Sequence, residues 1–339
     1  MKKDSKSQIN DQLTNKTVLI TGGTGSLGQA LTKRLLNSKV KAIRIFSRNE
    51  NKQVTMESKF EDDRLRFLLG DIRDQVRLER ALENVDIVFH AAALKHVPVV
   101  EYNPFEAIKT NVIGSSNVIE ACLHENVEIA VGIGTDKAVS PLNTYGATKL
   151  LMEKLFITAG NYLDQRKHKT KFLALRYGNV LGSSGSVIPK FIEQIKNGKK
   201  ISITDPNMTR FSITMDEALE FILSSVSMSK GSEVFVPKIK SYKIETVKDA
   251  MKELFDKVEY EKIPVRQGEK HHETLINDAE IKYTLETDSR YIILREFADE
   301  VTKGTYPGMK MTSLKKQYSS DVVEQMSSTE LAKMIKKMI

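Results

Sequence analysis

The sequence TVLITGGTGSLG at residues 17–28 decides the fold, because an apolar run leads directly into glycines spaced three apart. Residues 17–21 have the composition of a buried strand, and Gly22, Gly25 and Gly28 follow it. Such a loop before a helix gives a tight turn, a close backbone approach to a pyrophosphate and room for the helix to pack on the strand. The stretch therefore predicts a dinucleotide site at the start of that helix. The loop residues expected to contact the dinucleotide are Gly22, Thr24, Gly25, Ser26, Leu27 and Gly28.

Strand and helix patterns alternate from this stretch onward. Apolar runs predict further strands at residues 42–47, 65–69, 85–90, 129–133 and 171–175, and helical periodicity appears at 26–37, 75–82, 105–124 and 145–162. Alternating strands and helices imply parallel β-α-β units. We therefore predict an α/β fold, a Rossmann-type doubly wound parallel sheet.

The pattern loosens after Tyr177, which indicates a smaller C-terminal α/β lobe. Helices are expected at 187–197, 215–227 and 246–255, and short strands at 201–204 and 233–236. The absence of a glycine-serine linker predicts that the two parts pack closely. The predicted division is 15–180 for the cofactor domain (with parts of the later chain returning to it), 181–300 for a substrate-binding lobe, and 301–339 for a polar, loosely docked tail that ends in a short helix at 328–339.

The composition excludes several classes of protein. Hydrophobic residues make up 40% of the 339 residues and charged residues 28%, which is ordinary for a folded chain and excludes long-range disorder. The net charge is +8, but the basic residues are spread out and no zinc-finger or RNA-binding pattern accompanies them, so we expect no nucleic-acid partner. No apolar run could cross a bilayer, so we expect no membrane contact and a cytoplasmic location. A lone cysteine, Cys122, fits a reducing compartment.

The end of the second strand distinguishes NADP from NAD. NAD-binding folds usually place an acidic residue there for the ribose 2′-hydroxyl, whereas this sequence has Ser47-Arg48. A serine and a guanidinium suit a 2′-phosphate, so we predict NADP, with a surface arginine as the alternative. Asp71 and Ile72 follow the third strand and are placed to meet the adenine. Ala91, Ala92 and Ala93 follow the fourth strand and leave room for the cofactor.

A tyrosine and a lysine begin the long helix at residues 145–162. Tyr145 and Lys149 are four residues apart, so both side chains lie on one helix face. An ammonium near a phenol lowers the pKa of the tyrosine, which can then take a proton from a sugar hydroxyl. Thr135, at the end of the fifth strand, stands about where a hydroxyl partner is needed.

In these features the chain resembles the extended short-chain dehydrogenase/reductase superfamily, in which the glycine loop, Asn111, Thr135 and the Tyr145/Lys149 pair occur in this order. More closely, it resembles the UDP-N-acetylglucosamine 4,6-dehydratase family that inverts C5. The motifs that carry this resemblance lie within residues 15–280 and are AAALKHVP at 91–98, TDKA at 135–138, RYGNV at 176–180, GSVIP at 185–189, ITD at 203–205, MTRF at 208–211 and GEK at 268–270. By resemblance, Asn111 joins the cofactor contacts, and we expect a homo-oligomer.

The resemblance implies a reaction with no net redox change. NADP+ oxidises C4 of a UDP-N-acetylhexosamine, water is eliminated across C5–C6, and the hydride returns to C6 to give a UDP-2-acetamido-2,6-dideoxy-L-arabino-hex-4-ulose. Where retaining relatives have an Asp-Glu pair, this chain has Asp136-Lys137. By resemblance, Lys137 handles the C5 proton and Asp136 is the acid at the C6 oxygen. A lysine base must be neutral part of the time, so we expect Lys149 to help depress the pKa of Lys137.

The resemblance also implies a set of substrate contacts: Lys95, Asn179, Thr204, Arg210, Arg266 and Glu269. Arg210 could equally form a structural salt bridge. The chain departs from the family pattern at two places. Gly134 replaces a residue that is often Ser or Thr, and Ser183-Ser184 occupies a loop that often carries an arginine for the diphosphate or the subunit contact.

Three alternatives remain open. A UDP-sugar 4-epimerase of the same fold would not need an acid–base pair at C5 and C6, and a C5-retaining dehydratase would carry an acid in place of Lys137. A non-catalytic NADP sensor would be expected to lose the Tyr145/Lys149 pair. Neighbouring His271 and His272 suggest a metal, but no acidic or cysteine partner stands at ligand spacing, so we expect none.

Overall fold

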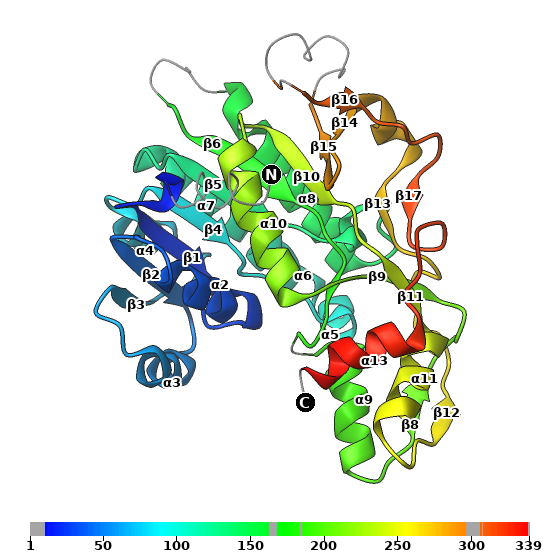
Figure 1. Cartoon of the computed structure of the whole chain (residues 1–339). Helices are drawn as coiled ribbons and strands as arrows, with labels where there is room; N and C mark the ends of the chain where they lie inside the picture. Colours follow the sequence, from blue (N-terminus) through cyan, green and yellow to red (C-terminus); the bar gives the residue numbers. More distant parts are fainter. Residues whose placement is uncertain (1–10, 163–167, 184, 296–305, 307, 338–339) are drawn as a thin grey trace.

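A computed structural model of the chain describes residues 11–162, 168–183, 185–295, 306 and 308–337. Within these ranges a ten-stranded sheet forms the centre, in the order β16-β14-β15-β10-β6-β5-β4-β1-β2-β3 (Figure 1). Its parallel strands are β1 (Thr17–Thr21), β2 (Ala42–Ser47), β3 (Leu65–Leu69), β4 (Ile87–His90), β5 (Ile129–Ile133), β6 (Lys171–Leu175) and β10 (Glu233–Pro237). The predicted doubly wound parallel sheet is therefore confirmed.

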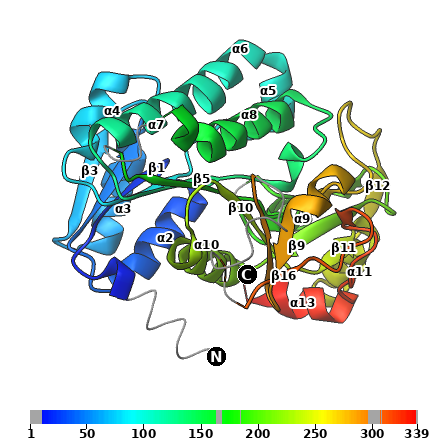
Figure 2. The ribbon, with the colours of Figure 1, turned by 90° about the horizontal axis from the view of Figure 1, so that it is seen from above.

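Helices cover both faces of this sheet, as Figure 2 shows. On one face α2 (Ser26–Leu36) and α10 (Met215–Met228) contribute Leu31 and Ile222 to one apolar core. On the other face α4 (Gln75–Leu82), α7 (Gly114–His124) and α8 (Thr144–Thr158) contribute to a second core. All residues of β1 are buried, because its two faces meet the two cores.

The helix expected at 105–124 is three elements in the structure. These are α6 (Pro104–Ala107), a π-helical turn η1 (Ile108–Ile113) and α7. The π turn directs Thr110 and Asn111 inward, where both are buried. A wide turn of this kind has no signature in hydrophobic periodicity, so the prediction missed it. The prediction also missed α3 (Glu50–Phe60) and α5 (Val97–Tyr102), whose sequences lack a clear apolar stripe or are short.

The chain after β7 contributes both to the large sheet and to a separate lobe. Four of its described strands join the large sheet: β10, β14 (Thr284–Glu286), β15 (Arg290–Ile293) and β16 (Lys310–Met311). The helix α10 packs on one face of this sheet. A separate group packs around a third core, on which Leu181, Ile188 and Met251 converge. Its elements are α9 (Val187–Lys196), β8 (Ile201–Ile203), α11 (Ile244–Leu254), β12 (Tyr260–Lys262) and α13 (Ser328–Lys336). The domain boundaries at 180 and 300 stay a prediction.

A small sheet joins these two parts. It contains β7 (Asn179–Val180), β9 (Thr209–Ile213) and β11 (Ser241–Lys243). Beside it, β13 (Thr274–Ile276) pairs antiparallel with β17 (Tyr318–Ser319), and short turns η2 (Asp136–Ala138), η3 (Ala159–Tyr162) and η4 (Asp278–Tyr283) complete the fold. No helix in the described part of the chain has both the length and the apolar character that a bilayer span requires.

The described part of the C-terminal tail is packed, in contrast to the loosely docked tail expected from its polarity. Leu331 and Ile335 of α13 are buried against α11, and Ser327 caps the helix by accepting from the Glu330 amide. Its apolar residues stand four apart, so a mostly polar segment still buries one helix face. Residues 301–305, 307, 338 and 339 of this tail lie outside the described residues.

Candidate active site

A cleft of about 630 Å³ opens at the carboxyl ends of the parallel strands, where the strand order reverses between β1 and β4. This is where open α/β sheets bind their ligands. It brings together most of the residues that the sequence predicts for the site. The predicted residues in its wall are Gly22, Thr24, Gly25, Ser26, Leu27, Gly28, Ser47, Arg48, Asp71, Ile72, Ala91, Ala92, Ala93, Lys95, Thr135, Lys137, Tyr145, Lys149 and Asn179.

The glycine loop of the cleft has no space for side chains. Gly22 has a φ of +65°, and a Cβ added there would lie 2.8 Å from the Ala92 Cα. A Cβ on Gly28 would lie 2.3 Å from the Gly23 carbonyl oxygen. The Gly25 amide donates to the Gly22 carbonyl at 2.9 Å, and Gly25 is the N-cap of α2. The loop thus fits a pyrophosphate at a helix N-terminus.

The second strand delivers two further groups to the cleft. Ser47 is buried, and the Arg48 side chain is 56% exposed, with its guanidinium 3.8 Å from the Asp71 carboxylate. Lys52, from the first turn of α3, also lines this end, and sequence reasoning missed it because that helix was not foreseen. Asn49 begins α3 by accepting a hydrogen bond from the Lys52 amide. Ser47, Arg48 and Lys52 therefore lie together on one rim of the cleft.

Tyr145 and Lys149 project from the first turns of α8 into the cleft. The helix begins there because Asn143 accepts from the Gly146 amide at 2.8 Å. The Lys149 amine donates to the Ile133 carbonyl at 2.6 Å, and burial lowers the pKa of Lys149 to about 8. Desolvation raises the pKa of Tyr145 to about 12, and the charge of Lys137 opposes it. The expected lowering of the pKa of Tyr145 by Lys149 is therefore wrong here, because desolvation outweighs the one cation, Lys137, that acts on the phenol.

Thr135 links the tyrosine to the acid–base pair. It forms a hydrogen bond with Tyr145, and its hydroxyl donates to the Asp136 carboxylate at 2.8 Å. It also begins η2 by accepting from the Lys137 amide. Because only two residues separate η2 from the end of β5, the carboxyl end of that strand positions Thr135, Asp136 and Lys137.

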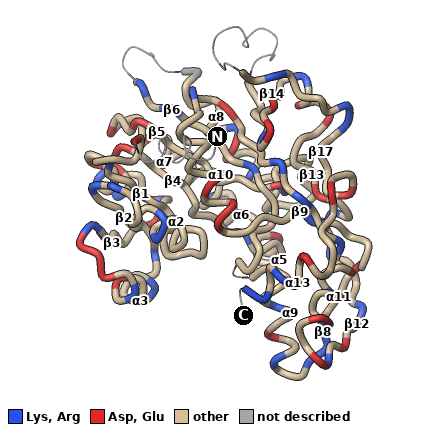
Figure 3. The backbone as a smooth tube through the Cα atoms, in the orientation of Figure 1, with Lys and Arg blue, Asp and Glu red and all other residues tan. Residues whose placement is uncertain are grey.

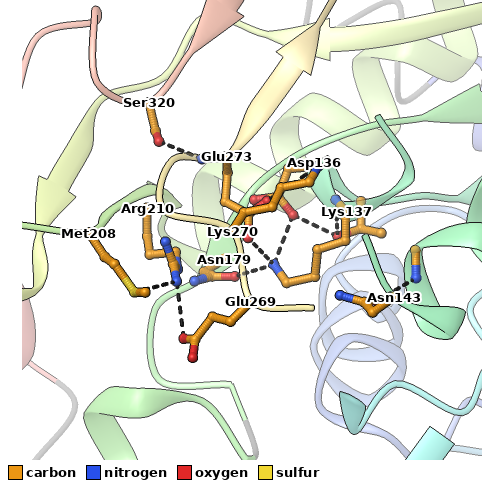
Figure 4. Close-up of polar contacts among 12 residues, drawn as sticks. Asp136, Lys137, Asn143, Asn179, Met208, Arg210, Glu269, Lys270, Glu273 and Ser320 are labelled. Atoms are coloured by element: carbon orange, nitrogen blue, oxygen red, sulfur yellow. Dashed lines mark hydrogen bonds and ion pairs between the residues drawn. The ribbon is translucent and has the colours of Figure 1, made fainter. Parts of the chain in front are cut away.

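The Lys137 amine lies among three oxygen-bearing side chains, as Figure 4 shows. Its Nζ is 3.0 Å from Asp136 Oδ1, 3.5 Å from Glu273 Oε1 and 3.3 Å from Asn179 Oδ1. Asp136 is fully buried behind the lysine and does not itself line the cleft. Burial lowers the pKa of Lys137, but the charges of Asp136 and Glu273 outweigh burial and raise it above its usual range.

This direction corrects the depressed pKa expected from the sequence. The expectation counted Lys149 as the nearby charge, whereas the charges that decide the pKa are two carboxylates, with Arg210 as the opposing cation. Glu273 was missed altogether. Only its place three residues after the GEK motif hinted at a role, and no spacing rule connects it to residue 137.

The remaining predicted residues lie outside the cleft wall. Asn111 exchanges hydrogen bonds with the Leu94 backbone and donates to Thr148, so it supports the wall from behind. Arg210 pairs with Glu269 at 3.1 Å and donates to the Thr209 carbonyl. Thr204 is half-buried and Arg266 is exposed, both on the lobe beyond β9. At the two departures from the family pattern, Gly134 and Ser183 line the cleft, and Ser184 lies outside the described residues.

The paired histidines bond to neighbours on the lobe. His271 Nε2 lies 3.0 Å from Asp205 Oδ2, and His272 Nδ1 lies 2.8 Å from the Thr209 hydroxyl. The described residues contain no group of three or more histidine, cysteine or carboxylate side chains that could hold a metal ion.

Comparison with known proteins gives one family and two activities. The family described as polysaccharide biosynthesis protein matches residues 18–295. The UDP-N-acetylglucosamine 4,6-dehydratase (inverting) of Campylobacter jejuni strain 81-176 is 46% identical over 280 residues, which are 82% of each chain. The UDP-glucose 4-epimerase of Rickettsia akari is 39% identical over 329 residues, which are 95% of each chain. The crystal structure of Pen from Bacillus thuringiensis superimposes with a TM-score of 0.87 at 37% identity, covering 96% of this chain and 99% of that chain.

Proposed function

Because the chain belongs to the polysaccharide biosynthesis protein family of extended short-chain dehydrogenases/reductases, we propose that it is an NADP-dependent UDP-N-acetylglucosamine 4,6-dehydratase that inverts C5. One observation carries the proposal. The Asp136-Lys137 pair stands in the turn that follows β5, and Lys137 shares a cleft with Tyr145 and Lys149. An acid and a base beside an oxidising site are what an elimination across C5–C6 requires.

The cofactor proposed for the cleft is NADP. When bound, its nicotinamide supplies the hydride acceptor for C4 and the hydride donor for C6. The shape of the glycine loop supports binding of the pyrophosphate, and Lys149, which lines the same cleft, is proposed to hold the nicotinamide ribose. Ser47, Arg48 and Lys52 on one rim supply a hydroxyl and two cations for a 2′-phosphate.

The acid–base pair needs only one proton to serve both of its roles. At the start of elimination Asp136 must be a carboxylic acid and Lys137 a neutral amine. That form differs from the ion pair only by one proton moved across the 3.0 Å between Nζ and Oδ1. Asp136 then gives this proton to the departing C6 hydroxyl, and Lys137 takes the C5 proton, so the ion pair is restored. The raised pKa of Lys137 describes that ion pair and is compatible with the base role.

Tyr145 is proposed to take the C4 hydroxyl proton as C4 is oxidised. Desolvation raises the pKa of its phenol to about 12, so Tyr145 must first release its own proton to solvent in the open cleft, and the charge of Lys137 favours the phenolate that then accepts the C4 proton. Its contact with Thr135, which also bonds Asp136, holds the phenol beside the acid–base pair. Asn179, which accepts a hydrogen bond from Lys137, is proposed to contact the sugar, and Lys95, which also lines the cleft, is proposed to contact the diphosphate.

Thr204, Arg210, Arg266 and Glu269 are proposed to contact the uridine diphosphate. They lie on the lobe outside the cleft wall, and Arg210 and Glu269 pair with each other. Contact with substrate therefore requires that it extend from the cleft across β9. Such an extension suits a nucleotide sugar, whose sugar and nucleoside ends lie on either side of a diphosphate.

We also propose a homo-oligomer in the cytoplasm. Large apolar side chains are exposed on α5, α6 and α8, which contact one another, and Tyr102 and Phe105 are 88% and 78% exposed. An exposed apolar surface of this kind is typical of a subunit contact. Basic and acidic residues are interspersed over the described chain, which supports neither a nucleic-acid surface nor an acidic-lipid surface (Figure 3).

A UDP-sugar 4-epimerase is the second candidate, favoured by the Rickettsia relative that matches 95% of the chain. Mass spectrometry after incubation with UDP-N-acetylglucosamine separates the two candidates. The dehydratase yields a product lighter by one water, whereas an epimerase yields one of unchanged mass. Bound NADP with no conversion of any UDP-sugar would contradict both candidates and favour a sensor.

A further inference from the structure

We propose that Glu273 is a positioning residue for Lys137, and that its carboxylate holds the lysine amine in the acid–base pair and sets the pH at which that pair loses its proton. The inference rests on the proposed function for its catalytic consequence. The contact itself is a property of the resting structure.

The geometry places Glu273 as the second counter-charge of one amine. Its Oε1 lies 3.5 Å from Lys137 Nζ, and its side chain is 4% exposed. Its second oxygen, Oε2, accepts no hydrogen bond within the described residues and lies 3.9 Å from Lys270 Nζ. A buried carboxylate is stable only beside positive charge, so Glu273 and the two lysines depend on one another.

Glu273 reaches this position from a different part of the chain than Asp136. It immediately precedes β13, which contacts η2, and its amide donates to the Ser320 hydroxyl at 2.9 Å. The Ser320 amide donates back to the Glu273 carbonyl at 2.8 Å, and the Thr209 hydroxyl lies 2.6 Å from the Ser320 hydroxyl. Hydrogen bonds of its backbone therefore fix the position of Glu273, and its carboxylate contacts the Lys137 amine.

A second carboxylate has a specific use in the proposed reaction. Asp136 must change its protonation during elimination, so alone it cannot give Lys137 a constant counter-charge. Glu273 takes no part in the proton transfer and keeps a negative charge beside Nζ while the ammonium forms at Lys137. Charge that develops beside a fixed opposite charge is stabilised in the transition state.

Other charged groups also face the Lys137 amine, and each acts on its titration. Asp136 from η2 favours the ammonium, and Arg210 from β9 opposes it. Tyr145 from α8 interacts with Lys137, and Lys270 lies across Glu273 from it. Since the Glu273 carboxylate favours the ammonium, removing its charge lowers the pKa of Lys137.

The test compares Glu273→Gln with the wild-type protein in two measurements. The first is the NMR titration of the Lys137 side chain, labelled with ¹³C-lysine and assigned through Lys137→Arg. The second is the pH dependence of turnover, whose basic limb reports loss of the proton of the pair. We expect both to move to lower pH by roughly 1–3 units, the range for an opposite charge at this distance. We also expect kcat to fall by about tenfold or more, with KM for the sugar nucleotide little changed.

Glu233→Gln is the matched control. Glu233 is as deeply buried, but it lies at the amino end of β10, opposite the cleft, where Ser229, the Gly231 amide and Tyr306 bond its carboxylate. This variant should lose stability without moving either titration. Glu273→Asp keeps the charge, so its Lys137 titration and its kcat should lie between those of Glu273→Gln and the wild-type protein.

An unchanged Lys137 titration in Glu273→Gln would overturn the inference, as would an equal shift in the Glu233 control. The titration needs no substrate. A wild-type protein that fails to dehydrate UDP-N-acetylglucosamine would therefore sink the proposed function, while the titration would still decide the role of Glu273.

Discussion

The cofactor half and the acid–base half of the cleft are built in different ways. The glycine loop, Ser47 and Arg48 come from short, continuous segments at the ends of β1 and β2. The surroundings of Lys137 come from η2, β7, β9 and the residue before β13. A motif can therefore specify how a nucleotide is held, whereas the protonation state of a catalytic lysine depends on residues brought in from distant parts of the chain.

The largest effect should come from Lys137→Ala, which removes the proposed base but leaves the glycine loop intact. Turnover of UDP-N-acetylglucosamine should fall by about 10²–10⁴-fold, the contribution of a general acid or base. The affinity for NADP, measured by calorimetry, should change little. A variant that loses NADP binding together with turnover would show that the two halves are not separable.

Gly22→Ala changes the cofactor half of the cleft and should weaken NADP binding, which Lys137→Ala leaves intact. The new Cβ would meet Ala92 at 2.8 Å in a backbone with positive φ, so we expect a loss of about 1–3 kcal/mol of stability and a large loss of NADP affinity. Gly198→Ala is the matched control, because Gly198 has the same φ of +65° with nothing within 4 Å of its Cβ. Equal loss of NADP affinity in both variants would contradict the proposal that the glycine loop binds the pyrophosphate.

Arg48→Ala tests the choice between NADP and NAD. Loss of a charged contact to the 2′-phosphate should lower the preference for NADP by about tenfold to a hundredfold. Binding of both dinucleotides by calorimetry gives the ratio. Lys52→Ala should have a smaller effect in the same direction, and an unchanged ratio in both variants would remove the physical basis for NADP.

The smallest expected effect is a pH dependence of cofactor binding. The pKa of Lys149 is lowered to about 8, so its ammonium is present below that pH and lost above it. At pH 9 only about a tenth of it remains charged, and NADP affinity should be several-fold weaker than at pH 7. Lys149→Met should bind more weakly at pH 7 and show a flat profile. A wild-type affinity that is constant between pH 7 and 9 would contradict this role.

The same division decides what the sequence could predict. Gly22, Arg48, Tyr145 and Lys149 could be located because strand ends, glycine spacing and helical period are local properties. The sheet was predicted for the same reason, although β10 was expected in the small lobe and instead pairs with β6.

What could not be predicted depends on three-dimensional contact. The predicted direction of the pKa shift of Lys137 was wrong because the charges of Asp136 and of Glu273, which is remote in sequence and adjacent in space, outweigh burial. Asn111 lies behind the cleft wall because the π-helical turn η1 directs it there. The sequence could not predict this, because such a turn has no period of its own. Lys52 was missed with the helix that carries it, whose residues form only a weak apolar stripe.

The central claim is that Lys137 and Asp136 act at C5 and C6 of a nucleotide sugar. The most direct measurement is NMR of the product formed from UDP-N-acetylglucosamine in heavy water. Our account predicts a 4-keto-6-deoxy sugar with deuterium at C5 and the L-arabino configuration. A product inverted only at C4, with no deuterium at C5, would contradict it and assign the chain to the epimerases.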